Sequence, residues 1–139
     1  MDIKLNLVNQ SNSTDGTDVV IFQQNTVPSF DELAVAWQVI QHLAPGDYHP
    51  FLYPEAVTVA AADSWGNYTP QLAATPGSRY HLYRSEGGDV LGPDGAAASA
   101  QAIEIANDLP QGAMTALVYR DGLVVATKTN VAPGQRAVF

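Results

Sequence analysis

Aromatic and polar side chains gather in one short segment, which reads Asp63-Ser64-Trp65-Gly66-Asn67-Tyr68. A tryptophan and a tyrosine beside an amide and a carboxylate can form a stacking platform with hydrogen-bonding groups, as sugar recognition requires. We therefore predict a ligand-binding loop formed by Asp63, Trp65, Asn67 and Tyr68, with a carbohydrate as the ligand. The alternative is that Trp65 closes one end of the hydrophobic core, as loop aromatics commonly do.

Metal and nucleophile chemistry have weaker support in the sequence. The three histidines, His42, His49 and His81, show none of the short spacings typical of zinc or copper sites, although a turn at Pro45-Gly46 could bring the first two together. No serine lies in a Gly-x-Ser-x-Gly elbow, and the chain has no cysteine. We therefore predict a non-catalytic protein without a resident metal or cofactor.

Calcium stays an open alternative, because acidic and amide residues cluster in three loops. Calcium binds carboxylate and carbonyl oxygens from such loops, but Asp and Asn also occur in turns for reasons of backbone geometry. No twelve-residue EF-hand pattern is present. The three oxygen-rich loops are residues 15–18, 63–67 and 89–94.

The composition excludes several classes of partner. The 139 residues carry a net charge of −8, with only six Lys and Arg, so no basic patch for nucleic acid or anionic lipid can form. No apolar run approaches the roughly 18 residues of a membrane helix, and the N-terminus lacks a secretory signal, so we expect no membrane insertion and a cytoplasmic protein by default. A surface poor in Lys and Glu resembles a protein interface.

Residues 114–128 predict a β-hairpin, because Asp121-Gly122 lies between two apolar runs and suits a type I′ turn. Continuous pairing from that turn sets Leu117 opposite Ala126. Both faces of the hairpin are then apolar, so each needs a cover from the chain's own core or from another molecule. One predicted face carries Ala116, Val118, Leu123 and Val125, and the other carries Leu117, Tyr119, Val124 and Ala126.

The chain ends on residues 136–139, which read as the beginning of a strand. Three explanations are open: Phe139 docks into the fold, the polypeptide is a fragment, or a neighbouring molecule completes this edge. Edge strands invite the addition of a neighbouring strand. We therefore predict self-association through one hairpin face and this terminal edge, at Leu117, Tyr119, Val124, Ala126, Val138 and Phe139.

The whole chain, residues 1–139, reads as one all-β domain. Eight to ten short strands with regularly spaced turns predict a single antiparallel β-sandwich. Residues 3–7 alternate as a half-buried first strand. Residues 30–43 fit a strand better than a helix, although Ser29 and Glu32 have capping-box spacing; the sequence allows one short helix, either near residues 30–43 or near residues 95–101. We expect Trp37, Ile103 and Ile105 in the core.

These observations favour a non-catalytic structural protein. We expect it to self-associate through β-sheet faces or edges into an oligomer, filament or lattice, so that its main partner is a second copy of itself. The alternative is a small lectin-like module that binds carbohydrate through the 63–68 loop. A hydrolase is a third reading, without a site visible in the sequence.

Overall fold

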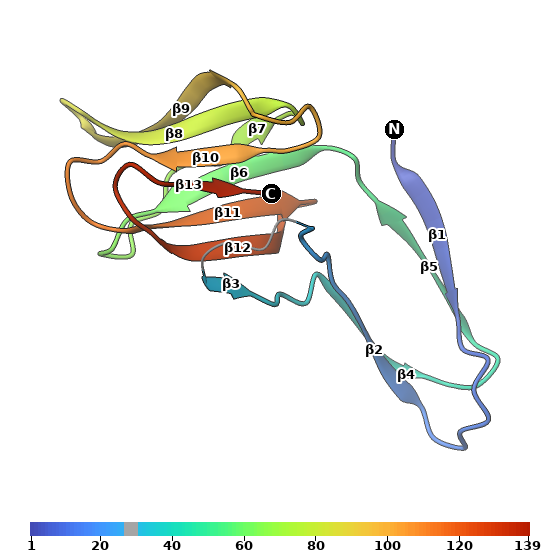
Figure 1. The fold of residues 1–139 in the computed structure, drawn as a ribbon. Coiled ribbons are helices and arrows are strands. Elements are labelled where there is room, and N and C mark those ends of the chain that lie inside the picture. Colours follow the sequence, from blue (N-terminus) through green and yellow to red (C-terminus); the bar gives the residue numbers. More distant parts are fainter. Residues whose placement is uncertain (27–30) are drawn as a thin grey trace.

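The computed structural model describes residues 1–26 and 31–139, and this part is all-β, with thirteen strands and no helix (Figure 1). The predicted fold class is confirmed, with more strands than the eight to ten expected. The one short helix considered near residues 30–43 or 95–101 does not form within the described residues, and the strand favoured for residues 30–43 is present as β4 (Gln38–Leu43). Residues 31–43 contain two strands, residues 95–101 contain a strand end and a turn, and Ser29 and Phe30 lie outside the described part.

Two sheets form the body of the molecule. The larger has the strand order β3-β12-β11-β6-β7 and consists of Asp31–Leu33, Leu123–Val131, Met114–Arg120, Val57–Ala62 and Leu72–Ala74. The smaller has the order β13-β10-β8-β9 and consists of Arg136–Val138, Glu104–Asn107, Ser78–Ser85 and Gly88–Ala96. All pairs are antiparallel except β8 with β10, because the chain between β9 and β10 returns to the other side of β8.

The core lies between these sheets, as expected for a sandwich. Val59 on β6, Ile105 on β10 and Val125 on β12 are each at most 1% exposed and belong to one contiguous apolar cluster. Trp37 and Ile103 belong to the same cluster. The three core residues predicted from the sequence are therefore confirmed.

The predicted hairpin forms, with one correction to its register. Asp121 and Gly122 both have positive φ, as a type I′ turn requires. A β-bulge interrupts the pairing of β11 with β12, so Val118 lies opposite Ala126 and Leu117 lies opposite Thr127. Ala126 therefore joins Val125 in the core, and its predicted place on the outer face was wrong. Leu123, predicted on the same face as the buried Val125, is 49% exposed.

Four strands leave the body as two ribbons, which we call the arm (Figure 1). Strand β1 (Ile3–Val8) pairs with β5 (Tyr48–Tyr53), and β2 (Thr17–Ile21) pairs with β4 (Gln38–Leu43). At the far end the ribbons are joined by backbone hydrogen bonds, from the Asn9 amide to the Asp47 carbonyl and from the Gly46 amide to the Asn9 carbonyl. The predicted first strand is confirmed as β1, but it is largely exposed and not half-buried, because it lies in this arm and not in the sandwich.

Trp37 anchors the arm to the body. Its ring makes edge contacts with Phe51 and Tyr53 of β5, at centroid distances of 6.4 and 5.5 Å. Its indole Nε1 donates to the carbonyl oxygen of Arg120 at the end of β11, 3.2 Å away. One buried side chain thus ties an arm ribbon to the larger sheet.

The C-terminal residues lie against the smaller sheet. Strand β13 pairs with β10, and the backbone of Phe139 exchanges two hydrogen bonds of 2.9 Å with Ile103. The Phe139 side chain is partly buried against the core cluster. Phe139 therefore docks into the fold, as one of the three explanations for this terminal strand expects.

Candidate functional site

The predicted ligand-binding loop connects β6 with β7 and is organised by the Asp63 carboxylate. Oδ1 of Asp63 accepts hydrogen bonds from the backbone amides of Trp65 and Asn67, and Oδ2 accepts from the Asn67 side-chain amide, all at 2.9 Å. Gly66 takes the positive φ that the turn requires. These contacts hold the loop in one shape from within.

The ionised form of Asp63 stabilises this arrangement. The side-chain amide of Asn67, followed by the backbone amide of the same residue, holds the pKa of Asp63 below its ordinary value. A carboxylate accepts these hydrogen bonds better than a protonated acid does. Asp63 therefore serves the loop as an ordering group at neutral pH.

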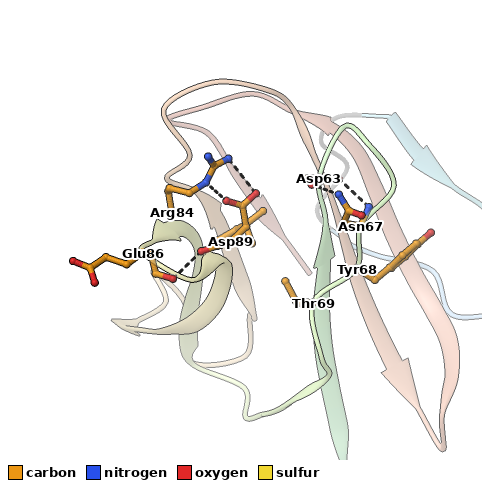
Figure 2. A pocket seen from close by; sticks show the side chains of 10 residues that line it. Asp63, Asn67, Tyr68, Thr69, Arg84, Glu86 and Asp89 are labelled. Atoms are coloured by element: carbon orange, nitrogen blue, oxygen red, sulfur yellow. Dashed lines mark hydrogen bonds and ion pairs between the residues drawn. The ribbon is translucent and has the colours of Figure 1, made fainter.

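A surface cleft of about 630 Å³ opens between this loop and the hairpin that joins β8 to β9 (Figure 2). Asp63, Asn67 and Tyr68 line it from one side. Arg84 and Asp89 line it from the other, where the Arg84 guanidinium forms an ion pair with the Asp89 carboxylate. The cleft thus combines planar hydrogen-bonding groups from both sides, whereas the ring of Tyr68, which is 65% exposed, points away from the Arg84–Asp89 pair (Figure 2).

Trp65 lies beside this cleft and points to solvent. Its side chain is 88% exposed, so it does not close the end of the core. The Trp65 ring is therefore accessible to a ligand, as the hypothesis of a carbohydrate-stacking platform requires. Trp65 lines a smaller neighbouring cleft of about 240 Å³, which shares Asp63, Arg84 and Asp89 with the first. The four predicted loop residues therefore border one continuous polar region of the surface.

Arg84 and Asp89 were not among the residues predicted for this site. They are five residues apart and become direct neighbours only because β8 and β9 pair in register at these positions. The glycine pair Gly87-Gly88 is typical of a turn between two strands. Nothing in the sequence, however, indicates that this hairpin lies next to the β6–β7 loop.

The arm carries a second candidate surface, which is apolar. Val20 and Val39 are direct cross-strand partners and are 51% and 52% exposed. The opposite ribbon also exposes apolar side chains on both of its faces. The exposed apolar residues of the arm strands are Ile3, Leu5, Val8, Val20, Val39, Tyr48 and Leu52, and Phe22 follows directly after β2.

The six residues predicted for self-association lie in the body. Leu117 and Ala126 are buried within a single copy. Tyr119, Val124, Val138 and Phe139 are half-buried. The largest share of exposed apolar side chains is therefore on the arm and not on the terminal hairpin.

The acidic loops considered for calcium have donors from the protein itself. Asp18 accepts a hydrogen bond from the His42 amide, and Asp94 forms an ion pair with Arg79. Among the histidines, His42 and His49 lie on arm strands, whereas His81 lies on β8 in the body. The three histidines thus do not share one element or one ribbon.

Comparison with known proteins adds no relative: no protein-family model, no curated protein and no solved structure matches this chain. Within residues 1–26 and 31–139, no helix has the length and apolar character needed to cross a bilayer.

Proposed function

We propose that this chain is a structural protein that self-associates, with a second copy covering the apolar surface of the arm. The observation that carries the proposal is an excess of exposed surface. A compact monomer of 14.8 kDa exposes about 7,000 Å². This chain exposes 8298 Å², roughly 1,300 Å² more. One partner's share of a standard protein interface is about 800 Å².

The apolar character of the arm supports association between copies, and not only an elongated shape of the monomer, as the source of the extra exposed surface. Isolated two-stranded ribbons are marginally stable in water, because neither face is covered. The cross-strand pair Val20 and Val39 exposes about half of each side chain, and Phe22 is 61% exposed. Covering these groups on contact contributes favourable free energy of roughly 25 cal/mol for each Å² buried.

Charge favours a second copy as the occupant. The four arm strands contain one basic residue, Lys4, and one acidic residue, Asp18, so their formal charges cancel. The net charge of −8 therefore lies outside these strands. The strand faces of two arms can therefore meet without an excess of like charges on the strands, while Asp2, Asp15 and Asp47 lie in the segments next to them.

The strand edges of the arm support the same proposal. Within the described residues, β1 pairs only with β5 and β2 pairs only with β4, so each strand has one edge without a strand partner. Natural proteins commonly guard such edges with lysine, and Lys4 is the one lysine on these strands. Strand addition between copies would satisfy these edges.

Light scattering coupled to size-exclusion chromatography tests this proposal across a concentration series from low micromolar to near millimolar. Val39→Lys places a charge on the exposed apolar face of β4 and should weaken association by at least about tenfold. The matched control is Leu123→Lys, which makes the same charge change at a half-exposed leucine of the body. A protein that stays monomeric throughout, or an equal effect of both variants, would contradict the proposal.

The cleft favours a second candidate function, carbohydrate binding. Its support is the ordered loop that presents Trp65 and Tyr68 beside Asn67, Arg84 and Asp89. Sugars stack their apolar ring faces on aromatic side chains and donate their hydroxyls to planar acceptors.

A glycan array followed by NMR titration with any sugar that binds tests this second candidate. Trp65→Ala should abolish binding without unfolding the protein, because Trp65 is exposed. Tyr48→Ala is the matched control, since Tyr48 is 69% exposed on the arm. Absence of binding across the array, or equal binding by the Trp65 variant, would remove this candidate.

A further inference from the structure

Three metal-ligating side chains from separate elements meet on the smaller sheet. His81 lies on β8, Asp94 lies on β9, and Asp108 follows directly after β10. One ring nitrogen of His81 and one carboxylate oxygen from each aspartate lie within 4.8 Å of one another. We propose that His81, Asp94 and Asp108 form a binding site for a divalent transition-metal ion, with Zn²⁺ as the ion that fits best.

The backbone holds these ligands in place before any ion binds. Asp108 donates its amide to the Leu82 carbonyl oxygen at 2.9 Å, which fixes it beside β8. His81 Nδ1 lies 2.7 Å from Asp108 Oδ2, and the His81 ring stacks on the Tyr83 ring at a centroid distance of 4.5 Å. Donor atoms must approach to roughly 3.3 Å of each other around zinc, so small side-chain rotations complete the site.

Arg79 is placed to orient Asp94 as a metal ligand through hydrogen bonds. Its Nε donates to Asp94 Oδ2 at 2.9 Å, and its Nη2 donates to the Asp94 backbone oxygen at 3.1 Å. Carboxylate ligands are commonly oriented by such hydrogen bonds. The guanidinium charge also opposes a cation nearby, so we expect affinity in the micromolar range and not tighter.

The ligand set selects the class of metal. An imidazole nitrogen with two carboxylates suits zinc and its first-row neighbours, whereas calcium and magnesium prefer oxygen ligands alone. A surface cleft of about 460 Å³ gives the ion an entry path from solvent, lined by Asp94 and Asp108 and also by the basic side chains of Arg79 and Arg136. It also leaves room for a water molecule as a fourth ligand, as in open zinc sites.

The sequence alone conceals this site, because its ligands are spaced 13 and 14 residues apart on three elements. No short motif brings them together. The parallel pairing of β8 with β10, which was not predicted, places Asp108 beside His81.

Isothermal titration with Zn²⁺ alone, repeated with Ca²⁺ and with Mg²⁺, tests the proposal on the intact chain. We expect one saturable Zn²⁺ site per chain and no comparable heat from the other two ions. His81→Ala and Asp108→Asn should each weaken binding by at least about tenfold. His42→Ala and His49→Ala, which change exposed histidines of the arm, are matched controls and should bind as the unaltered protein does.

Circular dichroism shows whether each variant is folded, and Asp108→Asn preserves the side-chain shape if His81→Ala does not fold. In the unaltered protein, Zn²⁺ should also shift the ring-nitrogen NMR resonances of His81. No saturable binding, equal binding of Ca²⁺, a loss of binding in the His42 or His49 variants, or intact binding in a folded Asp108→Asn variant would each overturn the proposal.

Discussion

The arm and the body are built from similar apolar strands, but the two regions cover them differently. In the body each sheet covers the other, so Val59 and Ile105 are fully buried. In the arm two-stranded ribbons leave Val20 and Val39 about half exposed. An apolar strand pattern in the sequence therefore indicates that a strand needs to be covered, but it does not indicate which molecule covers it.

The residue that joins the two regions should have the largest effect on stability. Trp37→Ala removes a buried ring from the core cluster together with its contacts to Phe51 and Tyr53. We expect the free energy of unfolding, measured by chemical denaturation, to fall by about 3–5 kcal/mol. Trp65→Ala is the control and should change it by less than about 0.5 kcal/mol, because that ring is exposed. Equal losses in both variants would break the distinction between the two tryptophans.

The sequence predicted those features that depend on local geometry. The turn at Asp121-Gly122 could be predicted because two neighbouring residues of these types suit positive φ. The burial of Ile103 and Ile105 could be predicted from alternation along one strand. The arm was not predictable, since 39 residues of chain separate the end of β1 from the start of its partner β5. The bulge that turns Ala126 inward could not be predicted from the two-residue repeat of a strand, because it inserts one extra residue into the pairing.

The residues of the candidate cleft also differ in whether the sequence could predict them. Asp63, Trp65, Asn67 and Tyr68 share one short loop, so their proximity could be predicted. Arg84 and Asp89 reach the cleft because a second hairpin packs beside the loop, and no local sequence pattern predicts that packing.

The second prediction concerns the pH dependence of stability that arises from Lys128, a basic side chain buried in the body. Lys128 is fully buried, and its Nζ donates to the Val138 carbonyl oxygen at 2.7 Å and lies 3.8 Å from Glu32 Oε2. Burial lowers the pKa of Lys128, and Glu32 opposes this effect in part. Between that lowered pKa and the ordinary value of 10.5, the unfolded chain binds more protons than the folded one. The Lys128 contribution to stability therefore becomes more favourable as pH rises through this window.

Denaturant unfolding of the protein and of Lys128→Met, from neutral pH to about pH 10, measures this contribution. The difference in unfolding free energy between the two proteins should shift in favour of lysine as pH rises. Comparing the two proteins removes the opposite contribution of Tyr119, whose pKa is raised by burial. Parallel pH profiles would mean that Lys128 is not a buried charge in solution.

The smallest expected effect is confined to the β6–β7 loop. The pKa of Asp63 is lowered, so its hydrogen bonds are fully formed above the ordinary value of 3.8 and are lost as pH falls through the lowered pKa. The amide NMR resonances of Trp65 and Asn67 should move together in that acidic window. Asp63→Ala should produce the released loop already at neutral pH, whereas Asp121→Ala, in an exposed turn of the body, should leave both resonances in place.

The claim that a second copy covers the arm is tested most directly by amide hydrogen exchange at two protein concentrations, one dilute and one near millimolar. We expect that exchange in β1, β2, β4 and β5 slows at high concentration, while the rates in β6, β8 and β11 stay constant. Equal exchange rates for the arm at both concentrations, with a monomeric mass at each, would contradict the claim.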